Sequence, residues 1–166
     1  MLAALMLLAG LARGAVVAAQ PLPPSDLAFG LEKLHWGMTM RDARSRYPLL
    51  EGAPTGSDQI TAALSLQNYA VAGCRFTATL EFARGRLGRV TLDSIGTAHL
   101  KACNDKIKAA LSRQYGRDPG GFSTASNPHG YSEYASWGGP VTAITYGALT
   151  DGFIMVRFAR ADQVRP

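Results

Sequence analysis

The sequence predicts an α+β fold in which two helices lie on one face of an antiparallel sheet of about six strands. Residues 74–82 alternate between apolar and polar side chains with period two, as in a strand with one buried face. Residues 98–115 change to the spacing of an amphipathic helix. The 18 glycines and 9 prolines favour a turn-rich protein that contains a sheet.

Residues 1–19 have the pattern of a signal peptide. An apolar run covers residues 2–11, and the small residues Val17-Ala18-Ala19 fit the site that signal peptidase cleaves. We therefore expect Gln20 to be the first residue of the mature chain. A membrane anchor is the alternative, although the apolar run is too short to cross a bilayer.

After the expected cleavage site the chain divides into a linker and one domain. Residues 20–28 carry three prolines and are expected to be extended. Residues 29–166 have the length and the apolar content of a single domain with its own core.

The domain is expected to begin with a short edge strand and a short helix. Residues 29–36 are interpreted as the strand, and residues 40–47 as the helix. Thr39 is the expected N-cap, Asp42 forms an imperfect capping box with it, and Pro48 ends the helix. We expect so short a helix to form only when it is docked on the sheet.

The next part of the chain predicts three antiparallel strands. Residues 49–57 are interpreted as a loop, and Arg84-Gly85-Arg86 as the turn of the central hairpin. Leu87 is out of register with Val90, so a β-bulge is expected at Gly88. The three strands are expected at residues 60–69, 74–82 and 87–93.

A second helix and three further strands complete the predicted fold. Thr97 and Gly116 stand where an N-cap and a C-terminal glycine belong around the helix. Residues 117–130 are rich in glycine, serine, proline and asparagine, and are expected to form a long mobile loop. The last strands are expected at residues 131–137, 141–146 and 153–160.

The order helix, three strands, helix, three strands suggests a degenerate α-βββ repeat. The three strands start at similar distances from Tyr47 and from Tyr115, the tyrosines that end the two helices. A similar spacing could also arise in an unrelated pair of meanders. In either case the sheet is expected to carry both helices on one face and to leave the other open.

The two cysteines are expected to form a disulfide. Cys74 lies on the inward face of its strand and Cys103 on the apolar face of the second helix, so both point into the same space. Export would place them in an oxidising compartment, where an even number of cysteines favours a bridge. Two buried free thiols are the alternative.

One short motif resembles a known group of proteins. Gly37-Met38-Thr39 opens a short helix, and Phe82-x-x-Gly85-x-Leu87-x-x-Val90 follows in the meander. This pattern resembles small exported bacterial domains, among them the outer-membrane assembly lipoprotein domain and the β-lactamase-inhibitor-protein-like fold. The resemblance implies a binding module with helices on an antiparallel sheet and no catalytic residues.

The sequence holds no motif for catalysis or for metal binding. His35, His99 and His129 have no metal-ligand spacing, and no serine stands in a nucleophile motif. We therefore expect neither a metal nor another cofactor. The nearest approach to a catalytic pair is Glu81 with Asp93, although neighbouring arginines favour ion pairs for both.

The net charge of +5 is modest. It would favour weak attraction to anionic lipid headgroups or polymers. No basic cluster is interleaved with aromatic residues, so nucleic acid is not an expected partner.

Several aromatic residues stand in strands or at their ends and are candidates for a binding patch on the open sheet face. Aromatic side chains are rigid and suit contacts with protein or glycan. The alternative is that they close the edges of the core. The candidates are Trp36, Tyr69, Tyr131, Trp137 and Tyr146.

These patterns together predict a periplasmic or secreted, non-catalytic binding module of the cell envelope. Its expected partner is another envelope protein or a glycan on the open sheet face, with no stable membrane anchor after signal cleavage. The alternative is a small secreted hydrolase that acts on a cell-envelope polymer through Glu81 or Asp93.

Overall fold

The computed structural model describes residues 27, 29–48, 50–53, 62–96, 100–116, 132–150 and 152–163. The expected signal peptide, the expected N-cap Thr97 and the expected loop at 117–130 lie outside these residues. The elements in chain order are α1 (Met40–Arg46), β1 (Glu51–Ala53), β2 (Ala62–Val71), β3 (Cys74–Ala83), β4 (Arg86–Ser94), α2 (Leu100–Tyr115), β5 (Glu133–Gly138), β6 (Thr142–Ala148), β7 (Ile154–Arg160) and a 3₁₀ turn, η1 (Ala161–Gln163).

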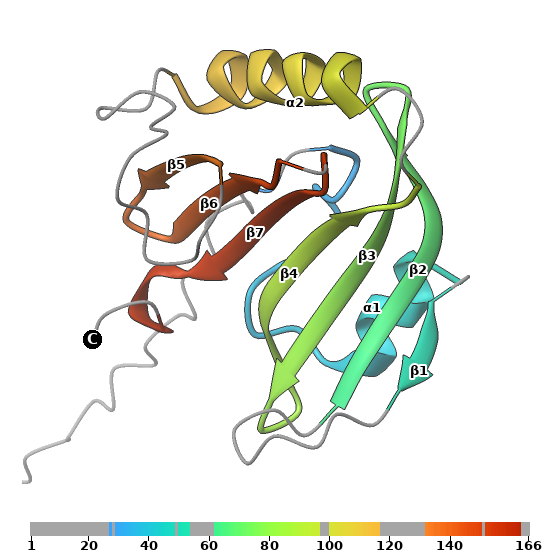
Figure 1. Cartoon of the computed structure of the whole chain (residues 1–166). Coiled ribbons are helices and arrows are strands. Elements are labelled where there is room, and N and C mark those ends of the chain that lie inside the picture. The colour runs from blue at the N-terminus through green and yellow to red at the C-terminus, as the bar shows by residue number, and fades with distance from the viewer. Residues whose placement is uncertain are drawn as a thin grey trace, which may run out of the picture.

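The described strands form one antiparallel sheet in the order β1-β2-β3-β4-β7-β6-β5 (Figure 1). The predicted α+β class with an antiparallel sheet is confirmed, with seven strands rather than six. The additional strand is β1, within the segment interpreted as a loop. Glu51-Gly52-Ala53 lacks apolar alternation, but it pairs with β2 and so supplies partners for backbone groups on that side of β2.

The predicted edge strand at 29–36 is wrong. Phe29 and Gly30 take positive φ values of 64° and 80°, and the amide of Leu34 donates a hydrogen bond to the carbonyl of Leu31. The segment therefore consists of turns. Its leucines recur every three or four residues instead of every two, and Leu27, Leu31 and Leu34 are at most 1 % exposed. The core thus begins at Leu27, inside the expected linker.

The central hairpin has the predicted pattern. Alternate residues of β3, from Cys74 to Phe82, are buried. Arg84 and Gly85 have φ values of 50° and 72°, as in a two-residue turn that matches the twist of the strands. Phe82 pairs with Leu87 and Glu81 pairs with Arg89, which leaves Gly88 as the extra residue of the predicted bulge.

The two halves of the chain have the same order of elements. Helix α1 precedes the meander β2–β4, and α2 precedes the meander β5–β7, with β1 as an addition to the first half. The last strands of the two meanders, β4 and β7, pair antiparallel at the centre of the sheet. This arrangement agrees with the expected α-βββ pattern of each half.

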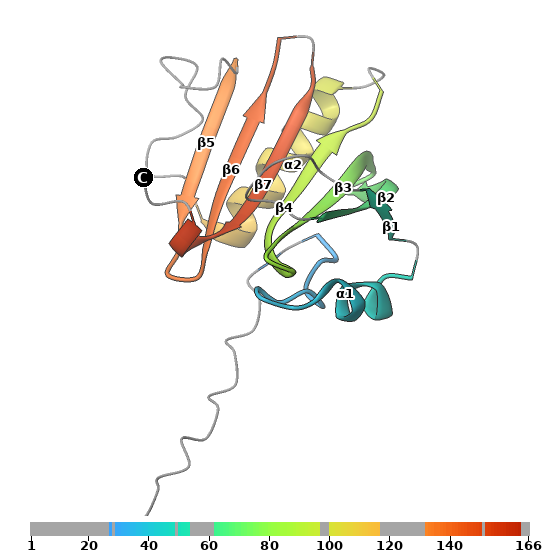
Figure 2. The same ribbon diagram turned by 90° about the horizontal axis from the view of Figure 1, so that it is seen from below.

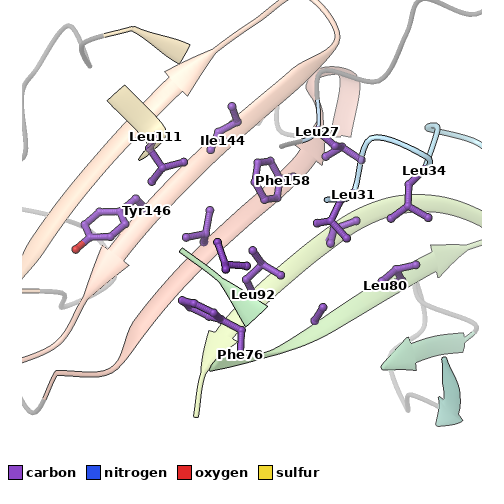
Figure 3. Packing of buried hydrophobic residues seen from close by; sticks show 14 of the residues in the cluster. Leu27, Leu31, Leu34, Phe76, Leu80, Leu92, Leu111, Ile144, Tyr146 and Phe158 are labelled. Carbon is purple, nitrogen blue, oxygen red and sulfur yellow. The ribbon is translucent and has the colours of Figure 1, made fainter. Parts of the chain in front are cut away.

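Both helices contribute to one core on a single face of the sheet, which we call the covered face. Figure 2 shows α2 behind β5–β7 and α1 beside the other end of the sheet. Ala43 of α1 and Ile107 of α2 belong to the same buried cluster. Figure 3 shows residues of this cluster from both halves: Leu27, Leu31, Leu34, Leu80, Leu111, Ile144, Tyr146 and Phe158.

The predicted disulfide joins Cys74 at the start of β3 to Cys103 in α2, with the two Cα atoms 5.8 Å apart. The bond closes a loop of 29 residues, which corresponds to roughly 3–4 kcal/mol in the chain-entropy model. At the other end of α2, Gly116 has a φ of 81°, as predicted for a C-terminal glycine.

Candidate binding site

The aromatic residues predicted to form a patch on the open face lie on the covered face instead. Tyr146 is fully buried, and Trp36 and Trp137 are only 9 % and 6 % exposed. Tyr69 packs against the core because a bulge after Leu66 shifts the alternation of β2 by one residue. The four therefore close the core, which was the alternative interpretation. The fifth candidate, Tyr131, lies outside the described residues.

Each of these side chains uses its polar atom in the fold. The indole N–H of Trp36 donates to the hydroxyl of Thr142 at 2.8 Å. The indole N–H of Trp137 donates to the carbonyl of Gly116 at 2.9 Å. The hydroxyl of Tyr69 donates to the carbonyl of Phe29. Burial raises the pKa of the Tyr69 hydroxyl to about 12, so it remains a donor at neutral pH.

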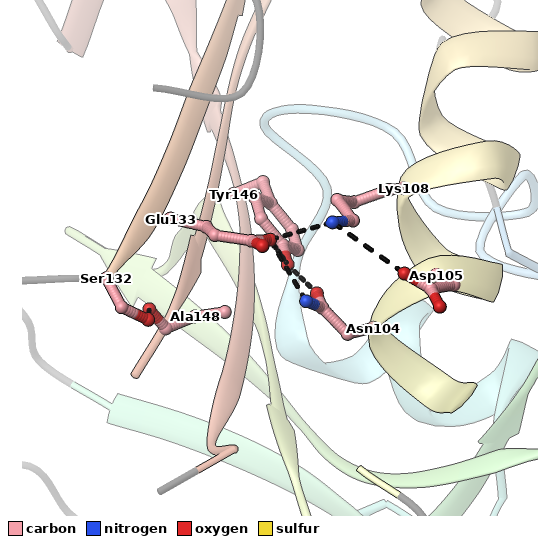
Figure 4. A network of polar contacts seen from close by, with 7 residues as sticks. All are labelled: Asn104, Asp105, Lys108, Ser132, Glu133, Tyr146 and Ala148. Atoms are coloured by element: carbon pink, nitrogen blue, oxygen red, sulfur yellow. Dashed lines mark hydrogen bonds and ion pairs between the residues drawn. The ribbon is translucent and has the colours of Figure 1, made fainter. Parts of the chain in front are cut away.

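Tyr146 belongs to a polar network between α2 and strands β5 and β6 (Figure 4). The carboxylate of Glu133 accepts hydrogen bonds from Lys108 Nζ at 2.9 Å and from Asn104 Nδ2 at 3.0 Å. The hydroxyl of Tyr146 donates to Asn104 Oδ1. Asp105 lies 3.8 Å from Lys108 on the solvent side.

The charges of Glu133 and Lys108 in this network form an ion pair. Partial burial opposes ionisation of Glu133, but the hydrogen bonds from Lys108 and Asn104 outweigh it and lower the pKa of that carboxyl. Burial raises the pKa of Tyr146, and the negative charge of Glu133 adds to this shift. The carboxylate is therefore ionised at neutral pH and accepts hydrogen bonds from two residues of α2, so the network fastens α2 to the sheet.

The opposite face of the sheet, which we call the open face, carries neither described helix. Partner residues of successive strands share a face, so the strand register defines rows of side chains across the sheet. One row runs from Glu51 on β1 across all seven strands. We call its six members on β2 to β5 the central row: Ser65, Thr79, Thr91, Arg157, Thr145 and Ser136. Five of its six members bear hydroxyl groups, which both donate and accept hydrogen bonds.

Arg157 stands in the middle of the central row. Its partners across the sheet are Thr91 on β4 and Thr145 on β6. Its Nε atom is buried and has no hydrogen-bond partner within the part of the chain that the structure describes. A buried N–H without a partner is costly. Since Arg157 is half-buried as a whole, a ligand oxygen would pair with the outer N–H groups of its guanidinium and not with Nε.

The two carboxylates considered for catalysis lie on this face but stand apart. Glu81 forms a 2.8 Å ion pair with Arg89, whereas Asp93 stands four residues further along β4 than Arg89. Four residues of strand extend about 13 Å, so the backbone positions of the two carboxylates are well separated, although the charge of Glu81 still contributes to the raised pKa of Asp93. Burial raises the pKa of Asp93, and the charge of Arg157 opposes that shift.

The described residues contain no group of histidine, cysteine, aspartate or glutamate side chains that could hold a metal ion. Within the same residues, no helix is long and apolar enough to cross a membrane. Among the large hydrophobic residues of the described ranges, Ile95, at 40 % exposure, is the one that is exposed.

Neither Arg157 nor the central row is predicted by the sequence patterns. The alternation of Val156, Arg157 and Phe158 does place the arginine on the face opposite the core. However, the row appears only when the register of six strands is known. The aromatic patch was predicted from residue type. Residue type carries no information about the face of the sheet on which a side chain lies.

Comparison with known proteins identifies no relative of this chain. The chain matches no family model, and no curated protein or solved structure resembles it at a significant level.

Proposed function

We propose that the protein is an exported, non-catalytic binding module of the cell envelope and that its ligand is a glycan bound across the open face. The observation that carries this proposal is the central row, where five hydroxyl groups flank the guanidinium of Arg157 across six strands. Hydroxyl groups and a guanidinium are suited to the hydroxyl and carboxylate groups of sugars.

A glycan fits this surface better than a protein does. Protein interfaces are usually centred on buried aromatic or aliphatic anchors. On the open face the apolar residues Ala63, Met155 and Ala159 are buried, and the half-buried Tyr134 is a single described aromatic on the edge strand β5 instead of a central anchor. The accessible parts of the central row, such as Ser136 and the half-buried Thr79 and Thr145, are small and polar.

Three features support an envelope location. The Cys74–Cys103 disulfide is typical of an oxidising compartment. Residues 1–19 have a signal-peptide pattern, and the motif around Gly37-Met38-Thr39 resembles exported bacterial domains. Mass spectrometry of the protein from its native host should find Gln20 as the first residue, and a soluble form that keeps Met1 would contradict export.

The alternative is a small hydrolase of envelope polymer. The raised pKa of Asp93 favours it, because a general acid must hold its proton near the working pH. The ion pair of Glu81 with Arg89 and the distance along β4 disfavour a carboxylate pair. If the protein releases soluble sugars from cell-wall material and Asp93→Asn abolishes that release, the hydrolase is the correct assignment.

Co-sedimentation with purified cell-wall sacculi tests the binding module. Thr145→Arg would place a large side chain on the central row, and Arg157→Met would remove the guanidinium but keep most of its length. Ala102→Arg, on the exposed surface of α2, is the matched control for the added arginine. We expect the wild type and the control to sediment with sacculi, and both open-face variants to lose most of this binding.

Equal binding by the wild type and both open-face variants would refute the open face as the site. A pull-down from a periplasmic extract separates the two partner classes. A protein retained by the wild type and by Ala102→Arg, but not by Thr145→Arg, would replace the glycan as the ligand.

A further inference from the structure

One end of the molecule carries an excess of positive charge. Helix α1 and the turn between β3 and β4 carry five arginines, and all five are exposed. One carboxylate, Asp42, lies among them, so the two segments hold an excess of four positive charges, against an excess of three on the longer helix α2. We call the five arginines the basic end: Arg41, Arg44, Arg46, Arg84 and Arg86.

The two segments of the basic end are held together by backbone contacts. Thr39 forms an isolated β-bridge with Arg86, and the amide of Leu87 donates to the carbonyl of Met38 at 2.9 Å. Arg41 and Gly85 line the same surface depression. The turn between β3 and β4, which carries Arg84 and Arg86, therefore lies beside the start of α1. Figure 2 shows α1 at this end of the sheet.

The one carboxylate of the basic end is already engaged within the fold. Asp42 Oδ2 accepts hydrogen bonds from the hydroxyl of Thr39 at 2.7 Å and from its amide at 3.3 Å. These hydrogen bonds lower the pKa of Asp42, and the charges of Arg46 and Arg41 add to the effect. Arg86 uses one guanidinium N–H for the carbonyl of Gly37, while no ion pair occupies any of the five arginines among the described residues.

We propose that the basic end binds the anionic surface of a phospholipid membrane. Arginine is the side chain best suited to phosphate, because its guanidinium donates two parallel hydrogen bonds. The surface has no exposed aromatic residue among those described, so it offers no platform for stacking nucleic-acid bases. Attachment through headgroup phosphates is peripheral and reversible, and it leaves the open face free for another ligand.

Vesicle co-sedimentation of the full mature chain tests this proposal. The probes are vesicles of phosphatidylcholine alone and vesicles that contain about 30 % phosphatidylglycerol. The variant Arg41→Ala/Arg46→Ala/Arg84→Ala removes three charges of the basic end. The matched control Lys101→Ala/Lys106→Ala/Arg113→Ala removes three exposed charges from α2.

We expect the wild type to bind the anionic vesicles and not the neutral ones, with binding lost as NaCl rises from about 0.05 to 0.5 M. The basic-end variant should lose on the order of a hundredfold in partition coefficient, because each arginine near an anionic surface contributes about 1 kcal/mol. The control should change the partition much less. Thermal melting of both variants verifies that they are folded.

Three results would overturn the proposal. The first is an equal loss in the two triple variants, which would show that net charge alone is responsible. The second is equal binding to neutral and anionic vesicles. The third is binding to short duplex DNA that the vesicles do not displace at an equal phosphate concentration, which would make nucleic acid the partner.

Discussion

The two halves of the covered face are closed in different ways. Over β2–β4 the cover consists of α1 and the turns that precede it, with Leu27, Leu31 and Leu34 buried. The hydrogen bonds of α1 are mostly local, such as those between Thr39 and Asp42. Over β5–β7 the cover is α2, which is fastened by a disulfide to β3 and by the Glu133 network to β5 and β6.

The difference follows from what each cover can bury. The segment before α1 brings three leucines into the core within eight residues, so the seven-residue helix needs little more than its cap and Ala43. Helix α2 has 16 residues, but only Ile107 and Leu111 are fully buried among its described side chains. A helix with so narrow an apolar stripe depends on a covalent bond and an ion pair, whereas the first cover depends on packing together with hydrogen bonds to the sheet, such as that between Leu87 and Met38.

Of the changes that test this difference between the two covers, breaking the disulfide should have the largest effect on stability. Cys74→Ser or Cys103→Ser should lower the free energy of unfolding by roughly 2–5 kcal/mol, and the double variant should match the single ones. Denaturant unfolding measures the loss. Hydrogen exchange should show faster exchange in α2 than in β2 and β3 after reduction. A uniform increase across both halves would show that the second cover does not depend on the bond.

Removing the charge of Glu133 should have an intermediate effect. Glu133→Gln should cost about 1–3 kcal/mol at neutral pH, because Lys108 loses its closest ionic partner. The lowered pKa of Glu133 means that its contribution exists above the pKa of the unfolded chain, near 4.3, and disappears as pH falls through the lower folded value.

The stability difference between wild type and Glu133→Gln should therefore shrink between about pH 5 and pH 3. Asp105→Asn is the control, since its carboxylate is 64 % exposed and 3.8 Å from Lys108. Denaturant unfolding at each pH provides the measurement. A pH-independent difference would show that Glu133 acts by packing and not by charge.

Removing the cap of α1 should have the smallest effect. Thr39→Ala should cost about 0.5–2 kcal/mol, since the amide of Asp42 loses its acceptor. The pKa of Asp42 should also rise toward its ordinary value, because Thr39 is the main cause of its lowering. Unfolding experiments and an NMR titration of Asp42 test the two effects.

Ser45→Ala is the matched control for this cap. Its hydroxyl donates to the carbonyl of Asp42 and has no role in the cap, so both the stability and the pKa of Asp42 should stay close to wild type. A Thr39→Ala variant that behaves like this control would mean that packing alone fixes α1.

The parts of the fold that depend on local patterns could be predicted from the sequence. Period-two alternation predicted β3, helical spacing together with the face of Cys74 predicted the disulfide, and Gly88 predicted the bulge. The failures arose where distant residues decide. Strand β1 exists because β2 offers it an edge, and Tyr69 reaches the core because of a bulge that no residue type marks.

The candidate site could not be predicted for the same reason. A row across six strands is a property of register, and register depends on bulges and turns in every hairpin. Arg157 is an ordinary charged residue in the sequence. It becomes a candidate only when Thr91 and Thr145 are found beside it.

The disulfide also bears on assembly, because it crosses between the halves of the chain. Cys74 belongs to the first meander, whereas Cys103 precedes the second, and the two meanders meet in the sheet only at the β4–β7 pair. Two copies that exchanged their second halves would restore this pair between chains. In such a dimer each Cys74–Cys103 bond would join two chains, so a bond formed within one chain during folding excludes the exchange and preserves the monomeric sheet.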